Sequence, residues 1–211
     1  PKLEYTFRHA LTNEVSYGTL LRERRVFLHA KITAALEQIA NDNLYDYIEA
    51  IAQHAYRGEL WNKAAKYLGQ AAAKAMSRSA FREAVSSYEQ ALDAVQHLPD
   101  SRDKLEMQID LRLELRNPFY FLSEFEELHR CLREAESIAE SISDNRRLGR
   151  VINFLNSYYG LMGEHHRSIE FGTRALRINR DDAELNTVTH YYMGAAYHHQ
   201  GEYAQSLEYL K

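Results

Sequence analysis

Apolar residues recur at helical spacing along the chain from position 41 onward. The first stripe ends at Gly58 and consists of Leu44, Ile48, Ile51, Ala52 and Ala55. Two more stripes follow over positions 61–75 and 81–95, and Pro99 closes the second of these. Spacings of three and four residues place side chains on one face of an α-helix. The pattern therefore predicts a series of amphipathic helices joined by short turns.

Positions 105–115 differ, because apolar and polar residues alternate there, which is the period of a β-strand. The segment nevertheless consists of good helix formers, with almost no β-branched or aromatic residues. Leu105, Ile109 and Leu113 share one helical face, and Leu111 lies on another. A helix packed between two neighbours needs both faces apolar, so we predict a helix over this segment.

Two later segments repeat one arrangement, in which a tyrosine stands four residues before a glycine. These are Tyr159 with Gly163 and Tyr197 with Gly201. The pattern resembles the first helix and turn of the tetratricopeptide (TPR) repeat. The second-helix signature of that repeat occurs as Trp61/Ala64/Leu68/Ala71, Phe81/Ala84/Tyr88/Ala91, Phe125/Leu128/Leu132/Ala135, His165/Ser168/Gly172/Ala175 and Tyr203/Ser206/Leu210. The resemblance implies an all-α, TPR-like solenoid of helical hairpins wound into a right-handed superhelix.

The spacing of these signatures departs from the family pattern. Ala64 and Ala84 are much closer together than the roughly 34 residues of the motif, and the later intervals are longer than it. We therefore expect the helix over 60–78 to serve as the second half of one hairpin and the first half of the next. Gly172 stands where the signature has a large residue. We expect that hairpin to be thinly packed at this point or to admit a neighbouring side chain.

Residues 1–40 do not follow the repeat. The runs Tyr5-Thr6-Phe7-Arg8-His9-Ala10-Leu11 and Leu20-Leu21-x-x-Arg24-Arg25 resemble the end of the winged-helix segment that follows the ATPase core of bacterial signal-transduction ATPases with numerous domains (STAND ATPases). The stretch from Gly58 to Ala75 is similar to the repeat region that comes next in those proteins. The resemblance implies a winged-helix remnant over 1–40, followed by TPR-like repeats over 41–211 that are truncated at the C-terminus.

The resemblance also implies a parent protein with further domains. Many STAND ATPases carry a class III adenylate or guanylate cyclase domain, and others carry a DNA-binding transcription domain. A histidine in the place of His9 approaches the phosphates of ADP in related ATPases, which implies a nucleotide-sensing role for His9 and ATP or ADP as ligands of the parent. The alternative for His9 is a partly buried histidine at a strand-to-helix corner. No G-x-x-x-x-G-K-[ST] phosphate loop is present, and we expect no cofactor in this part of the protein.

Charge and composition narrow the class of partner. A net charge of -4 gives no broad positive field for nucleic acid or anionic lipid. No run reaches the roughly 18 apolar residues of a membrane span. The single Cys131 leaves no disulfide framework and is compatible with a reducing, cytoplasmic setting. We expect a protein or peptide partner, no nucleic acid and no membrane, and leave self-association open.

Candidate binding residues follow from the register of the repeats. The first helix of each TPR hairpin lines a concave groove, where polar and aromatic side chains can hold a peptide. The positions that map to this groove are Asn117, Tyr120, Asn153, Ser157, Tyr191 and His198. An ordinary hydrated surface is the alternative. The two-lysine carboxylate clamp of chaperone-binding TPRs is not reproduced, because Leu113 stands at a lysine position.

An enzyme is the competing class of function. The doublets His165-His166 and His198-His199 suggest a metal site, but adjacent helical residues point about 100° apart and cannot chelate one ion well. The sequence repeats one helical pattern and offers no unique cluster of catalytic residues. This favours an interaction and regulatory module over an enzyme. We therefore predict a non-enzymatic module of a bacterial signalling ATPase or cyclase. The alternatives are the sensor region of an ATP-dependent transcription regulator and a histidine-based metal enzyme.

Overall fold

A computed structural model describes residues 15, 17–40, 43–179 and 182–211. These residues form helices and contain no strand. The helices are α2 (Arg22–Ala40), α3 (Leu44–Arg57), α4 (Trp61–Ser77), α5 (Phe81–Gln96), α6 (Arg102–Phe121), α7 (Phe125–Ser141), α8 (Asn145–Leu161), α9 (His165–Ile178), α10 (Ala183–His199) and α11 (Tyr203–Tyr209). The all-α prediction is confirmed, including the helix over 105–115, which lies inside α6.

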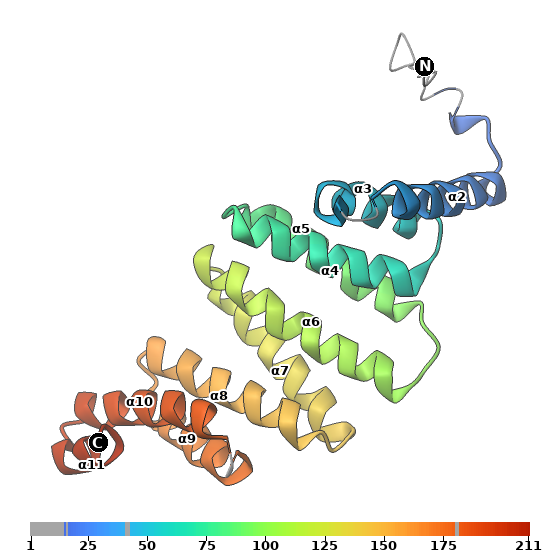
Figure 1. Cartoon of the computed structure of the whole chain (residues 1–211). Helices are drawn as coiled ribbons and strands as arrows, with labels where there is room; N and C mark the ends of the chain where they lie inside the picture. The colour runs from blue at the N-terminus through green and yellow to red at the C-terminus, as the bar shows by residue number, and fades with distance from the viewer. Residues whose placement is uncertain (1–14, 16, 41–42, 180–181) are drawn as a thin grey trace.

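The helices stack in chain order, from α2 at one end to α11 at the other (Figure 1). Helix α4 packs against both α3 and α5, so the predicted double role of the segment 60–78 is confirmed. Farther along, α6, α8 and α10 form one layer, because α8 contacts both of the others although neither is its neighbour in sequence. Helices α7, α9 and α11 pack against members of this layer.

Six tight turns in the described part of the chain share one backbone geometry. Each has a residue with positive φ, namely Glu59, Ser79, Ser123, Ser143, Gly163 or Gly201. The next N–H donates to a carbonyl five residues back, for example from Glu124 to Phe119 at 2.9 Å and from Glu164 to Tyr159 at 2.9 Å. This is the Schellman end of a helix. The same turn geometry therefore joins α3 to α4, α4 to α5, α6 to α7, α7 to α8, α8 to α9 and α10 to α11.

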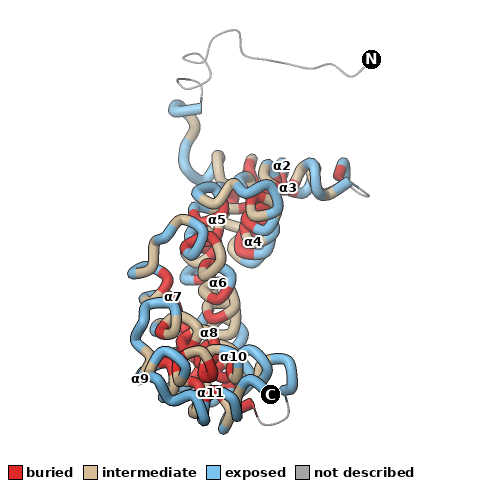
Figure 2. The backbone as a smooth tube through the Cα atoms, turned by 90° about the vertical axis from the view of Figure 1, so that its left-hand side faces the viewer, coloured by how far each residue is buried: buried red, intermediate tan, exposed pale blue. Residues whose placement is uncertain are grey.

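The core follows the axis of the stack (Figure 2). One cluster joins α2, α3, α4 and α5 around Ile51 and Leu68, and a second runs from α4 to α9 around Leu132 and Leu155. Each repeat of a solenoid contacts only the adjacent repeats, so the core is elongated rather than centred.

Gly172 admits a neighbouring side chain, as expected from its place in the repeat. A Cβ atom at this position would lie 2.4 Å from Cγ and 2.5 Å from Sδ of Met193. Met193 on α10 is fully buried. The missing side chain on α9 therefore makes room for a methionine from the next hairpin.

Candidate partner-binding groove

An open groove of about 700 Å³ lies between α8, the end of α9 and the start of α10. Helix α8 contributes Arg146, Arg150, Asn153 and Phe154, and α10 contributes Glu184, Leu185 and Val188. The groove thus combines an apolar surface with charged groups on both sides, a combination typical of sites for extended peptides.

Asn153 lies at the base of this groove and is fully buried. Its Nδ2 donates to the Leu185 carbonyl at 2.7 Å and to Thr189 Oγ1 at 2.7 Å, which ties α8 to α10. Its Oδ1 has no hydrogen-bond partner. A buried acceptor without a partner costs about 1–3 kcal/mol.

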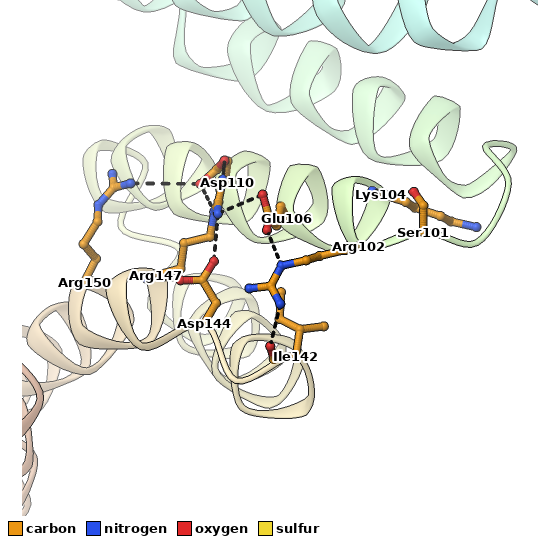
Figure 3. Close-up of polar contacts among 9 residues, drawn as sticks. All are labelled: Ser101, Arg102, Lys104, Glu106, Asp110, Ile142, Asp144, Arg147 and Arg150. Carbon is orange, nitrogen blue, oxygen red and sulfur yellow. Dashed lines mark hydrogen bonds and ion pairs between the residues drawn. The ribbon is translucent and has the colours of Figure 1, made fainter.

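The α8 side of the groove is basic. Arg146 is exposed and forms no ion pair with any residue that the structure describes. Arg150 Nη1 lies 4.0 Å from Asp110 Oδ1. Asp110 is already engaged by Arg147, whose Nε and Nη2 donate to its two oxygens at 2.9 and 2.8 Å (Figure 3). The guanidinium groups of Arg146 and Arg150 are therefore available to a ligand.

Arg147 itself fixes α8 against α6. Besides Asp110 it contacts Glu106 on α6 at 3.1 Å and Asp144 at 2.8 Å (Figure 3). Hydrogen bonding to Asp110 raises the pKa of Arg147, against the effect of burial. Burial alone would raise the pKa of Asp144, but hydrogen bonds from the backbone and side chain of Arg147 outweigh it and lower that pKa. Charge-assisted hydrogen bonds from Arg147 therefore hold the spacing of α6 and α8.

The α10 side of the groove is acidic. Asp182 caps α10 by accepting a hydrogen bond from Leu185 N at 3.0 Å. Glu184 is exposed and has no ion-pair partner among the described residues. The groove therefore presents opposite charges on its two sides, with Phe154, Leu185 and Val188 between them.

The six residues predicted from the repeat register all lie on α6, α8 or α10, but only Asn153 lines this groove. Asn117 is half-buried and accepts a hydrogen bond from Arg116, and the Ser157 hydroxyl donates to the Asn153 carbonyl at 3.1 Å. Tyr120, Tyr191 and His198 are exposed. Their part in binding stays a prediction, and His9 lies outside the described residues.

Sequence reasoning missed the arginines and Val188. A signal for them exists in the register, since Asp110, Arg150 and Val188 each stand thirteen residues before the positive-φ residue of the following turn. Equivalent positions on stacked helices meet along one surface. Extending the predicted register by one helical turn, from Asn153 on α8 and Tyr191 on α10 toward the N-terminus of each helix, would have identified Arg150 and Val188.

The candidate metal ligands are engaged in other contacts. The His165 and His199 rings are stacked, with centroids 4.8 Å apart and planes 7° from parallel, so their in-plane nitrogens cannot converge on one ion. His129 Nε2 is 2.9 Å from Tyr159 Oη, and burial raises the pKa of Cys131 to about 11. Within the described ranges, no three His, Cys, Asp or Glu residues are grouped so that they could hold a metal.

The arrangement of hairpins, turns and groove defines a TPR-like helical solenoid. Solved structures of similar fold include BtubC (BKLC) from P. vanneervenii, with a TM-score of 0.64 and 17% identity over 90% of this chain and 89% of that one. A kinesin light chain from Podosopora anserina with nearly identical TPR-like repeats gives a TM-score of 0.58 and 14% identity, covering 90% and 93% of the two chains. MamA gives 0.53 and 15%, covering 77% and 86%. At such identities the similarity establishes the fold alone.

Part of the chain is similar in sequence to an uncharacterized protein of Rhizobium meliloti (strain 1021). It is 35% identical over 99 residues, which cover 46% of this chain and only 9% of the relative. The matched segment is thus a small part of a much longer protein. No family model matches the chain. None of the helices in the described part has the length and apolar character needed to cross a bilayer.

Proposed function

We propose that this chain is a non-catalytic interaction module that binds a protein or peptide partner along the layer formed by α6, α8 and α10. The observation that carries the proposal is the open groove between α8 and α10, which has an apolar surface and charged groups of opposite sign on its two sides. An extended peptide would lie along this groove. Its apolar side chains would lie against Leu185 and Val188, and its charged ones would meet Arg150 or Glu184.

The remaining predicted residues extend the proposed site along the same layer. Asn117 and Tyr120 on α6, Ser157 on α8, and Tyr191 and His198 on α10 would contact successive parts of the partner. Exposed aromatic rings such as Tyr191 supply contact area at low conformational cost.

A regulatory setting in a larger cytoplasmic signalling protein is the second part of the proposal. The residues that resemble STAND ATPases support it, with 1–40 as the end of a winged-helix segment and 41–211 as the repeats. The short matched share of the long Rhizobium protein also supports a module within a longer chain. In such a parent, His9 would sense nucleotide, and a cyclase or transcription domain would receive the signal.

The groove is tested by selecting peptides from a displayed random library on the wild-type chain and measuring their affinity by fluorescence anisotropy. Val188→Asp adds a charge to the apolar part of the groove, at a position 39% exposed in the free chain. We expect this variant, and Arg150→Ala, to bind the selected peptides at least about tenfold more weakly, which corresponds to 1.4 kcal/mol.

Arg177→Ala is the matched control, because Arg177 is exposed on α9 and does not line the groove. It should leave affinity unchanged. Equal binding by wild type, Val188→Asp and Arg150→Ala, or failure to recover any peptide, would contradict the proposal.

A further inference from the structure

Arg116 on α6 is a half-buried cation without a carboxylate partner. Its Cζ lies 4.0 Å from the centroid of the Phe154 ring on α8, and Phe154 lines the groove between α8 and α10. Its Nη2 donates to Asn117 Oδ1 at 2.7 Å, whereas its Nε is buried and makes no hydrogen bond. Arg116 forms no ion pair with any residue that the structure describes. Guanidinium groups taken out of water are normally paired, so this one is unusual.

Several groups act on the charge of Arg116. Burial lowers its pKa, Glu114 and Tyr192 oppose this effect, and the nearby Arg150 adds to it. Glu114 stands two residues before Arg116 on α6, so the two side chains point to different sides of the helix and do not pair. A carboxylate brought close to a guanidinium group favours its charged form.

Two more arginines continue from this point along α8. Arg146, Arg150 and Phe154 follow one another at spacings of four residues, so they share one face of the helix, and all three line the groove. Arg150 approaches only Asp110, at 4.0 Å, and Asp110 already accepts two hydrogen bonds from Arg147 (Figure 3). Arg146 has no ion-pair partner among the described residues. This side of the groove therefore offers several positive charges around one aromatic ring.

We propose that an arginine row, formed by Arg116, Arg146 and Arg150, selects a peptide with acidic residues at alternate positions. One carboxylate would lie between Arg116 and Arg150, and the next would meet Arg146. Side chains one turn apart on a helix are separated by about 6 Å, and alternate side chains of an extended peptide by about 7 Å. Hydrogen bonds from guanidinium groups to carboxylates are strong. The inference rests on the proposed function and deepens it by naming the charge of the partner.

The acidic residues around the groove argue against a nucleic acid at the same place. Asp182 and Glu184 line its α10 side, and Glu114 is exposed on α6. A continuous phosphate backbone would meet these carboxylates, and like charges at close range oppose association. A peptide can place acidic residues at the arginine row and neutral or basic ones opposite Asp182 and Glu184.

The test begins with the displayed random library on the full chain. We expect the recovered peptides to be enriched in Asp and Glu at alternate positions. A recovered peptide is then made with an amidated C-terminus, so that only side-chain carboxylates remain. Replacing its acidic residues by Asn and Gln, or raising the ionic strength, should weaken binding, the replacement at least about tenfold by fluorescence anisotropy. Peptides that lose affinity for Val188→Asp but show no acidic preference would overturn this inference and leave the proposed function intact.

Two arginines of α6 give a matched pair of variants. Arg112 stands one turn before Arg116, pairs with Glu134 of α7 and donates to the Gln108 carbonyl. Arg116→Met should weaken binding of the acidic peptide at least about tenfold and leave the midpoint of thermal unfolding unchanged or higher, because the free protein loses an unpaired cation. Arg112→Met should lower the midpoint and keep the affinity, because Glu134 loses its partner.

The opposite behaviour of Arg116→Met, with lower stability and unchanged affinity, would show a purely structural role and overturn the inference. Tighter binding of a labelled single-stranded oligonucleotide than of the acidic peptide would overturn it as well.

Discussion

Gly172 and Met193 show how a single missing side chain shapes the packing of two hairpins. Because Met193 occupies the space beside Gly172 and is fully buried, a methyl group at 172 would force it to move. Gly172→Ala should destabilise the chain by about 1–3 kcal/mol despite the better helix propensity of alanine. Urea unfolding followed by circular dichroism measures the change. In a Met193→Ala background the same substitution should cost much less, and strict additivity of the two effects would refute the packing argument.

Arg147 and Arg146 are adjacent residues with opposite roles. Arg147 ties α8 to α6 through Asp110 and Glu106, whereas Arg146 has no ion-pair partner among the described residues. Arg147→Ala should lower the free energy of unfolding by about 2 kcal/mol, since Asp110 and Asp144 lose charged hydrogen bonds. Arg146→Ala should leave stability nearly unchanged. Equal thermal stability of both variants would show that the cluster does not hold the layer together.

At the scale of elements, the turns carry backbone strain that sequence alone does not reveal. Four of the six positive-φ turn residues are not glycine, and Ser123 has φ of 59°. Ser123→Gly should stabilise the chain by roughly 0.5–1 kcal/mol, because glycine adopts this conformation without steric cost. Ser137→Gly, in the exposed middle of α7, is the control and should destabilise it by a similar amount. Both are measured by the midpoint of urea unfolding, and the same sign for both would contradict the turn assignment.

The contact between α2 and α3 should make stability depend on pH. His29 Nδ1 lies 2.8 Å from His54 Nδ1, and His29 Nε2 lies 2.8 Å from Tyr17 Oη, so only one proton fits between the two rings. Burial lowers the pKa of both histidines below 6.5, helped by Arg57 for each and by Arg25 for His29. The unfolded chain then binds more protons below that pH. Stability should therefore fall as pH decreases from above 6.5 toward the folded-state pKa values.

Equilibrium unfolding between about pH 7.5 and about pH 5.5 tests this, in the range where histidine titrates. His54→Gln should flatten the dependence of stability on pH, because it removes one of the two contacting histidines whose pKa is lowered. The carboxylates with lowered pKa, such as Glu37, lose their contribution to stability mainly below the ordinary glutamate pKa of 4.5, outside the range of this measurement. An identical pH profile for wild type and His54→Gln would exclude the pair as its source.

At the scale of the whole molecule, periodicity and the TPR resemblance predicted the helices, the double role of α4 and the accommodation at Gly172. These features depend on local spacing, which a single sequence carries. The sequence did not predict the α6–α8 ion cluster, the His29–His54 contact or the arginines of the groove. Each of these features joins residues of separate helices. Which residues meet is decided by how the helices stack, and the spacing within one helix does not show it. Asn153 illustrates the difference, since its register was predicted but its complete burial and free Oδ1 were not.

We propose that a partner occupies the surface formed by the layer of α6, α8 and α10. The most direct test is a two-dimensional NMR titration of the labelled full chain with a peptide selected on it, with Asn153 as the reporter. We predict that the Asn153 side-chain amide and the backbone amides of Leu185 and Val188 shift, while those of α7 do not. Shifts confined to α7 or α2, with Asn153 unchanged, would contradict the account.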